Sequence, residues 1–355
     1  MSVNLTAGQA RWLRLRSHLL DGSELAPADV VRRAVALQGQ DLPAVQRAIA
    51  VRSRPGTTVD AVRAAFDAGE LVRSWPMRGT LFATTPEHLR ALLSFTGERI
   101  HRATARRREQ LGLSDAVVAH AREVLAEALA VQPLRRAEVL DLWEAAGITT
   151  ADGRGYHLLM NLSVAGLAHW GAFDETGAEQ YLTLTSGAPP EDPDAALAEV
   201  VRGFVLARGP VTADDLAWWT KLPKTLLRRA AAHVEDLVEV QVEGTKAWMI
   251  GDPAPPEAPA APDAAAVTLV PGFDEWILGY ADRSLVAGPG MLQALVPGGN
   301  GVFRPAVLVD GLAVGTWRLK RTGRGAPQPV IELVEPVPAR TREAVEAAVA
   351  AWPHG

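Results

Sequence analysis

The sequence contains no cysteine, which excludes disulfide bonds, thiol nucleophiles and cysteine-ligated zinc. It also contains no apolar run that approaches the length of a membrane span. The first six residues lack the charged and apolar blocks of a signal peptide. Together these absences predict a cytoplasmic protein that does not enter a membrane.

The common catalytic and cofactor motifs are missing as well. The eight histidines are dispersed, and no pair has the spacing or carboxylate neighbours of a zinc-binding helix. There is no Walker loop, and the glycine-rich stretch at 298–301 is not followed by a helix that would complete a phosphate cradle. No nucleophile elbow supports Ser-His-Asp catalysis. We therefore expect neither a metal ion nor another cofactor.

Size and charge set further bounds. The 355 residues suffice for two or three domains, and 48% hydrophobic with 22% charged residues is ordinary for a globular protein. The net charge is −5, whereas a protein that coats DNA non-specifically is usually basic. Any binding of nucleic acid must therefore use local basic surface set against an acidic remainder.

One pattern of helices followed by two strands occurs three times along the chain. In the first copy, Pro27 and Pro43 are suitable first residues for two helices. The predicted strand pairs that end the three copies are 71–75 with 79–83, 167–170 with 180–184, and 237–242 with 246–250. Three helices and a two-stranded ribbon are typical of a winged helix, and three copies are stronger support than one.

The last region of the chain differs from these copies. It follows a Pro- and Ala-rich linker at 253–262 and contains Asn300-Gly301 and Asp310-Gly311, which are strong hairpin signals. We expect a small antiparallel β-domain or half-open barrel, closed by a helix at 341–352. The predicted fold class is α+β, with three tandem winged-helix modules at 1–112, 113–188 and 189–252 and a C-terminal β-barrel domain at 253–355.

Two amides stand on either side of a glycine at Gln38-Gly39-Gln40, directly before Asp41. The glutamines project to the same side if the backbone is extended and diverge if it is helical. Gly39 makes a non-helical path inexpensive. One interpretation is a polar turn between two helices, and the other is a functional pair. For Asp41 we favour a cap on the next helix over a negative field at a site.

Several motifs together resemble a known family, the AlkZ-type winged-helix DNA glycosylases of bacteria, along nearly the whole chain. The motifs are Gln38-Gly39-Gln40, the Trp75–Leu81 run WPMRGTL, the Pro271–Arg283 run PGFDEWILGYADR, Asn300–Pro305 and Val314–Arg318. The family usually has a hydrophobic residue at the position of Gly39, and many relatives have histidine at the position of Phe82.

The resemblance implies three winged helices and a β-barrel arranged as a C-shaped clamp around duplex DNA. It implies monofunctional removal of alkylated purines, with interstrand crosslinks as substrates of some members. By position, Gln38 and Gln40 match the family's paired catalytic side chains. The partner is then duplex DNA bound by a monomer, associated with the nucleoid. The alternative is a winged-helix regulator that binds DNA without catalysis.

Basic residues supply candidate DNA contacts, although a run of charge is often only a solvated face. The candidates are Arg78, the Arg102–Arg108 cluster with Arg106, Arg107 and Arg108, and Lys221, Lys224, Arg228 and Arg229 in the third copy. The predicted hairpin tip Asn300-Gly301-Val302-Phe303, with Arg304, is either a buried hairpin or a probe of the minor groove.

The acidic pair Asp274-Glu275 lies in the longest motif. We expect these carboxylates to hold Arg283 or Tyr280 within the core of the β-domain. We likewise expect Trp276 and Trp317 to pack in that core and not to stack on DNA bases.

Overall fold

The computed structural model describes residues 3–253, 266–299, 301–320 and 328–354. These residues form a mixed α+β fold in which one order of elements recurs three times: a helix, a short extended segment, two helices and a hairpin. None of the helices in these ranges is long and apolar enough to cross a membrane.

The first unit begins where Pro27 fills the first turn of a helix, as expected. Its elements are α2 (Pro27–Ala34), β2 (Ala36–Gln38), α3 (Leu42–Ala50), α4 (Val59–Asp67), β3 (Val72–Met77) and β4 (Thr80–Thr84). The 25-residue helix α5 (Pro86–Gln110) then leads away from the unit.

The second and third units repeat this order. The second contains α6 (Asp115–Val131), α7 (Arg136–Ala145), α8 (Arg154–Val164), β5 (Ala168–Phe173) and β6 (Gln180–Leu184). The third contains α9 (Pro193–Arg208), α10 (Ala213–Thr220), α11 (Lys224–Ala231), β7 (Leu237–Val242) and β8 (Thr245–Ile250). In place of β2, these units have single bridges, Leu134 to Leu182 and Val211 to Trp248.

Two sheets connect the units to one another. The first and second units share a five-stranded sheet in the order β2-β4-β3-β5-β6, joined where Arg73 pairs with Trp170. The N-terminal strand β1 (Val3–Leu5) pairs in parallel with β7 of the third unit. Helix α1 (Ala7–Ser17) begins at a capping box formed by Thr6 and Gln9.

The C-terminal region does not form the predicted barrel. Its elements are β9 (Val267–Val270), α12 (Glu275–Leu278), α13 (Pro289–Leu295), the 3-10 turn η1 (Pro297–Gly299), β10 (Ala306–Val309), β11 (Leu312–Lys320), β12 (Gln328–Leu333) and α14 (Ala339–Ala350). The four strands make an open sheet in the order β12-β11-β10-β9, so the described strands β9 and β12 are edges that do not meet. Trp276 and Trp317 are buried in this region, as expected.

One of the two predicted hairpins is present. Asp310-Gly311 joins β10 to β11, and both residues have positive φ, as this turn requires. The predicted hairpin tip at Asn300–Phe303 is wrong, because α13 and η1 precede it where a hairpin needs a strand. Asn300 lies outside the described residues, and residues 301–305 form a loop that leads into β10.

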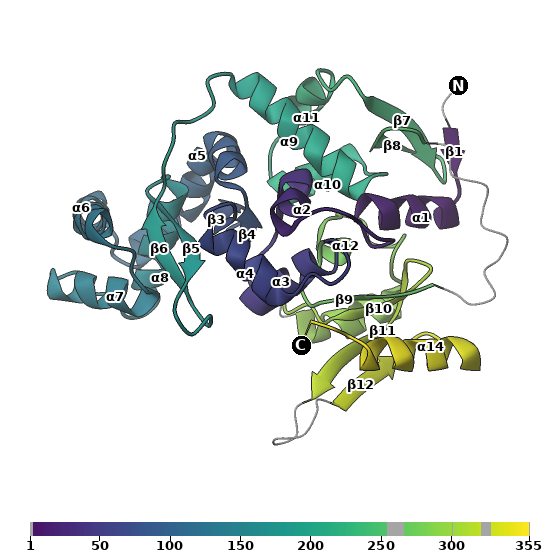
Figure 1. Cartoon of the computed structure of the whole chain (residues 1–355). Coiled ribbons are helices and arrows are strands. Elements are labelled where there is room, and N and C mark those ends of the chain that lie inside the picture. Colours follow the sequence, from purple (N-terminus) through teal and green to yellow (C-terminus); the bar gives the residue numbers. More distant parts are fainter. Residues whose placement is uncertain (1–2, 254–265, 300, 321–327, 355) are drawn as a thin grey trace.

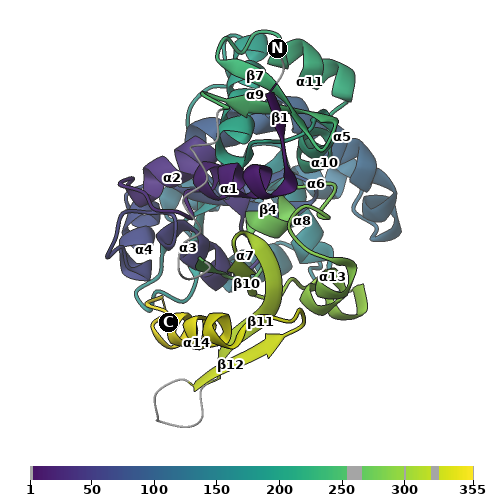
Figure 2. The ribbon, with the colours of Figure 1, turned by 90° about the vertical axis from the view of Figure 1, so that its right-hand side faces the viewer.

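Figure 1 shows the arrangement of the units, with the first unit in the middle of the molecule. The second unit extends to the left in this view, the third lies above, and the C-terminal sheet lies below on the right. Figure 2, turned by 90°, shows α1 between the third unit and the C-terminal sheet. The first unit therefore lies where it can receive side chains from every other part of the chain.

Candidate active site

Gln38 ends a strand and Gln40 lies in the bend that follows, and the side chains of both contact the beginning of β4. Gln38 is the last residue of β2 and pairs with Phe82. Its Nε2 lies 3.4 Å from Thr80 Oγ1, and the backbone N–H of Leu81 donates to Gln40 Oε1 at 3.2 Å. Both side chains therefore contact residues at the start of β4.

Gly39 is required by close packing and not by backbone conformation. Its φ is not among the positive values of the chain. A Cβ atom at this position would lie 2.9 Å from the backbone nitrogen of Ala83 and 3.0 Å from the carbonyl carbon of Phe82. The glycine N–H donates to Leu81 O at 2.8 Å. A hydrophobic side chain here would force the glutamine loop away from β4.

The two amides differ in what they leave available. Gln38 is 5% exposed, and its Oε1 accepts the backbone N–H groups of Gly39 at 3.0 Å and Gln40 at 3.2 Å. These bonds use both lone pairs of that oxygen. Gln40 is exposed, and one hydrogen bond is described for its Oε1. Gln38 therefore shapes the loop, while Gln40 presents an amide to solvent.

Asp41 is the N-cap of α3, as expected. Its Oδ1 accepts the backbone N–H of Ala44 at 2.8 Å, which satisfies one of the unpaired donors at the start of that helix. The capping role fixes the point at which the glutamine loop ends and the helix begins.

A buried carboxylate holds the backbone of Gln38. Glu275 is 2% exposed, and its Oε1 accepts the Gln38 N–H at 3.0 Å. Its Oε2 accepts Arg208 Nε at 3.1 Å, Arg208 Nη2 at 2.9 Å and Trp219 Nε1 at 3.1 Å. The carboxylate is thus fully engaged by a guanidinium, an indole and the backbone of β2.

Arg208 extends this network to both ends of β2. The side chain is fully buried and donates to Ala34 O at 3.0 Å and Ala36 O at 2.8 Å. These carbonyls flank Val35, which has a φ of 66° that is unusual for a β-branched residue. The network therefore stabilises a strained chain reversal between α2 and β2.

The expectation for the acidic pair is wrong, because neither carboxylate bonds Arg283 or Tyr280. Asp274 instead forms a bidentate pair with Arg52, at 2.7 and 2.8 Å, and both side chains are buried. Glu275 reaches Arg208 of the third unit. The carboxylates thus join the C-terminal region to the other units and do not serve its own core.

A neutral histidine completes this interior. Burial, followed by the charges of Arg52 and Arg208, lowers the pKa of His18 well below its ordinary value. Tyr280 OH donates to Arg208 O at 2.8 Å, so His18 Nε2, 2.8 Å away, donates to the tyrosine oxygen. His18 Nδ1 then accepts from Arg52. Burial also raises the pKa of Tyr280, so both groups remain uncharged.

Arg73 fixes the glutamine loop from the side of the second unit. It donates to Gly39 O at 3.1 Å and to Gln180 Oε1 at 2.7 Å. Burial lowers the pKa of Arg73 to about 10, partly offset by the charge of Asp41. The loop is therefore held by its own side chains, by Glu275 and by a cation bonded to β6.

The predicted DNA contacts are spread over several elements. Arg78 lies at the turn between β3 and β4, two residues before Thr80, and Lys221 is the C-cap of α10. Arg106 and Arg107, in the last turns of α5, and Arg228, on α11, are exposed. The other three cations form ion pairs: Arg108 with Asp115, Lys224 with Asp214, and Arg304 with Glu332. Val302 is 50% exposed, and Phe303 packs against Phe273.

Sequence reasoning missed Arg73 and Arg208. Arg208 carried a usable signal, because it continues the buried helical stripe of Val201, Phe204 and Val205 at a position where an apolar residue is expected. A charged residue in such a stripe predicts a buried partner. Arg73 gave no comparable signal, because a charged residue next to Val72 also fits a strand with one face in solvent.

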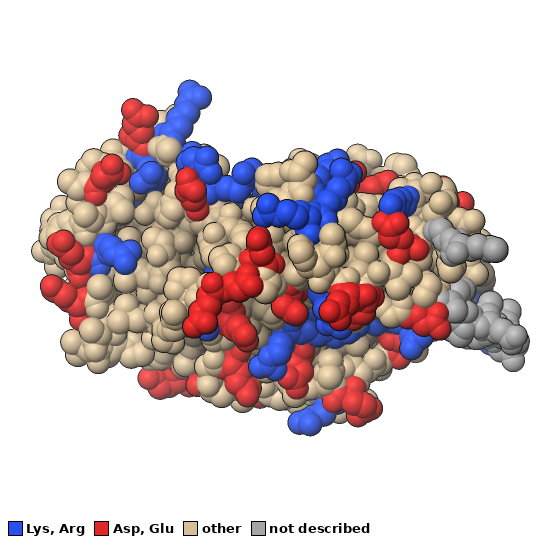
Figure 3. Space-filling model, turned by 90° about the horizontal axis from the view of Figure 1, so that it is seen from above, with Lys and Arg blue, Asp and Glu red and all other residues tan. Residues whose placement is uncertain are grey.

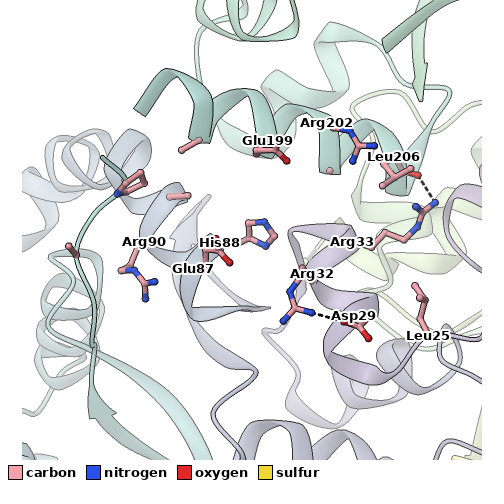
Figure 4. A pocket seen from close by; sticks show the side chains of 15 residues that line it. Leu25, Asp29, Arg32, Arg33, Glu87, His88, Arg90, Glu199, Arg202 and Leu206 are labelled. Carbon is pink, nitrogen blue, oxygen red and sulfur yellow. Dashed lines mark hydrogen bonds and ion pairs between the residues drawn. The ribbon is translucent and has the colours of Figure 1, made fainter. Parts of the chain in front are cut away.

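A cavity lies elsewhere, between α2, α5 and α9 (Figure 4). It has a volume of about 850 Å³, and neither glutamine lines it. Its cations are mostly engaged, since Arg32 pairs with Asp29, Arg33 donates to Leu206 O and Arg202 pairs with Asp236. Figure 3, seen from above, shows acidic side chains gathered near the middle of one face. Neither the cavity nor this acidic face favours the binding of a polyanion such as DNA.

Comparison with known proteins places the chain in a class of base-removing enzymes. The family described as DNA glycosylase AlkZ-like matches residues 31–353, and the chain belongs to this family. It is therefore a DNA glycosylase, as the resemblance implied.

Two comparisons with individual proteins agree with this assignment. The interstrand DNA cross-link repair glycosylase of Streptomyces sahachiroi is 26% identical over 338 residues, which cover 87% of this chain and 86% of the relative. The solved structure of Streptomyces sahachiroi DNA glycosylase AlkZ has a TM-score of 0.79 with 24% identity, covering 99% of this chain and 97% of that one. The structural likeness shows a shared fold.

Proposed function

We propose that this glycosylase hydrolyses the N-glycosidic bond of alkylated purines in duplex DNA and that interstrand crosslinks are among its substrates. The observation that carries the proposal is the glutamine loop, in which Gln38 is locked by the backbone and Gln40 faces solvent. The relative from Streptomyces sahachiroi is an interstrand DNA cross-link repair glycosylase, which supports the crosslink as a substrate.

The chemistry fits a site built from amides. An alkylated purine already carries a positive charge, so the pair of electrons of the C1′–N bond neutralises the base as it leaves. The sugar passes through an oxocarbenium-like state. Water then forms the new C1′–O bond and releases one proton to solvent. The protein must place that water, and it need not protonate the base.

The two glutamines divide this task. Gln40 Oε1, with one lone pair beyond its bond to Leu81, accepts a hydrogen bond from the attacking water and turns the water oxygen toward C1′. Gln38 positions Gln40 by accepting its backbone N–H. A neutral amide is a weak base, so ordinary uncharged purines are poor substrates.

The clamp and its contacts form the second part of the proposal. The three units are tandem winged helices that surround duplex DNA together with the C-terminal sheet, and the enzyme acts as a monomer. Phosphates are bound by basic residues, and the loop at 301–304 lies in the groove beside the lesion. The contacts are Gly301, Val302, Phe303, Arg304, Arg78, Arg106, Arg107, Arg108, Lys221, Lys224 and Arg228.

The test is excision from methylated duplex DNA, with abasic sites revealed by alkali. We expect Gln38→Ala and Gln40→Ala to lower single-turnover base release by about 10²-fold or more, as when one positioned group is lost. DNA affinity is expected to change little. The exposed Gln132→Ala serves as a control with normal activity.

Two outcomes would count against the assignment. Equal losses of affinity and excision in the glutamine variants would place these residues in binding only. A folded wild-type protein that binds methylated duplex and releases no base would favour the alternative of a DNA-binding protein without this activity.

A further inference from the structure

Three cations surround one indole beside the glutamine loop. Trp218 of α10 lies 3.7 Å from Lys221 Nζ, 5.0 Å from Arg78 Cζ and 5.8 Å from Arg283 Cζ, each measured to a ring centroid. The cations come from the third unit, the first unit and the C-terminal region. Within the described ranges, no ion pair joins any of them to an acidic side chain.

The three cations repel one another in partly desolvated positions. Burial lowers the pKa of Lys221, and the charge of Arg78 lowers it further. Burial and then Arg78 lower the pKa of Arg283 in the same way. Glu275, whose charge acts on Arg78, is occupied by Arg208. A monoanion placed among the three would relieve this repulsion.

Backbone strain marks two of the three positions. Arg78 has a φ of 57° and Lys221 a φ of 59°, both in the left-handed region that favours Gly and Asn. Arg78 is the first residue of a two-residue turn with Gly79, a position at which Asn, Asp or Gly is preferred. Retention of long cations at strained positions is expected where the charge has a function.

The cluster is close to the site of chemistry. Thr80, which contacts Gln38, follows the turn that carries Arg78. A cavity of about 330 Å³ opens beside Arg78 and Lys221 and is also lined by Arg99 of α5. The third cation of the cluster contacts the loop at 301–305, because Arg283 Cζ lies 5.4 Å from the ring centroid of Phe303. The cations thus lie between the glutamines and the loop at 301–305.

The geometry points to a binding site for one backbone phosphodiester of the damaged DNA strand, held by Arg78, Lys221 and Arg283. This assignment rests on the proposed function. Trp218 covers and orients the cations, because its ring is already occupied by Lys221. Capture of one phosphate next to the lesion would set the position of the sugar relative to Gln40.

The test removes the charge of one phosphate at a time. Duplexes carrying one methylated purine receive a single neutral methylphosphonate at successive positions around the lesion. For the wild type we expect one position at which excision falls by about tenfold, the loss of one charged hydrogen bond. In Lys221→Met, excision with the natural phosphate is lower, and the same methylphosphonate causes little further loss.

The variant Arg78→Asn distinguishes a loss of phosphate binding from a loss of folding. Asn suits the left-handed turn position, so thermal melting is expected to be unchanged or improved, while excision falls as in Lys221→Met. Arg228→Met, on α11 outside the cluster, should keep the full sensitivity at the chosen position. If all variants keep the wild-type sensitivity, or if no single position matters, the phosphate site is wrong.

Binding measured alongside keeps the two proposals distinct. Excision without any sensitive phosphate would overturn the phosphate site alone. Failure to excise, combined with affinity that depends on one phosphate and on Lys221, would overturn the proposed function and retain the site.

Discussion

The three units differ at one point, the junction between their first and second helices. In the third unit Val211 pairs with Trp248 and the next residue, Thr212, caps α10. In the second unit Leu134 is followed directly by the N-cap Arg135 in the same way. In the first unit Gly39 and Gln40 stand between the last paired residue, Gln38, and the N-cap Asp41.

Under the proposed function, this difference gives one of the three copies the candidate site. The first unit has a longer strand, two additional residues at the junction, and a buried carboxylate that binds the strand. Loops held by a rigid scaffold are common places for catalytic groups. The other two units keep the short junction, and their polar residues there serve as helix caps.

The strongest test of the comparison removes the support of the first junction. Arg208→Met leaves Glu275 as an unpaired buried charge, so we expect a loss of about 3–5 kcal/mol in the free energy of unfolding. The measurement is equilibrium denaturation. Arg202 is on the same helix as Arg208, and Arg202→Met breaks its exposed pair with Asp236. This change should lower the free energy of unfolding by less than about 1 kcal/mol. Equal losses would contradict a special role for this junction.

A second test crowds the junction while leaving its charges in place. Gly39→Ala places a methyl group against the backbone of β4, and overpacking of this kind costs about 1–3 kcal/mol. Excision should fall with it, because Gln40 is displaced. In the same sheet, Gly171→Ala meets only Thr183 Cγ2 at 3.4 Å and is expected to be neutral or slightly stabilising. Normal excision by a folded Gly39→Ala enzyme would show that the close approach is dispensable.

The smallest effect concerns which units face DNA. Helix α5 follows the first unit and carries Arg107, and α11 of the third unit carries Arg228. If both helices bind phosphates, Arg107→Ala and Arg228→Ala should each lower the slope of log affinity against log salt concentration by about one. Titration of an undamaged duplex measures the slope. A change for only one variant would restrict the contact to that unit.

Local features of the fold were predictable from the sequence. The capping box at Thr6 and Gln9, the proline that begins α2 and the Asp310-Gly311 turn each depend on neighbouring residues. The shared direction of Gln38 and Gln40 was predictable for an extended backbone. These features need no information about distant parts of the chain.

Long-range features were not predictable in the same way. The partners of Asp274 and Glu275 lie 222 and 67 residues away in Arg52 and Arg208, so no local pattern identifies them. Asn300-Gly301 has the composition of a hairpin turn, but the preceding segment is helical. Closure of a barrel depends on whether edge strands meet, which the number of strands does not determine.

The bond between Glu275 and the Gln38 backbone also has a consequence for biosynthesis. The two residues are separated by 237 positions. At about 5–20 residues per second, a ribosome needs roughly 10 to 50 s to proceed from one to the other. During this interval the nascent first unit has its glutamines without their anchor. A premature stop upstream of Glu275 would yield a chain with the complete glutamine motif but without the carboxylate that holds the Gln38 backbone.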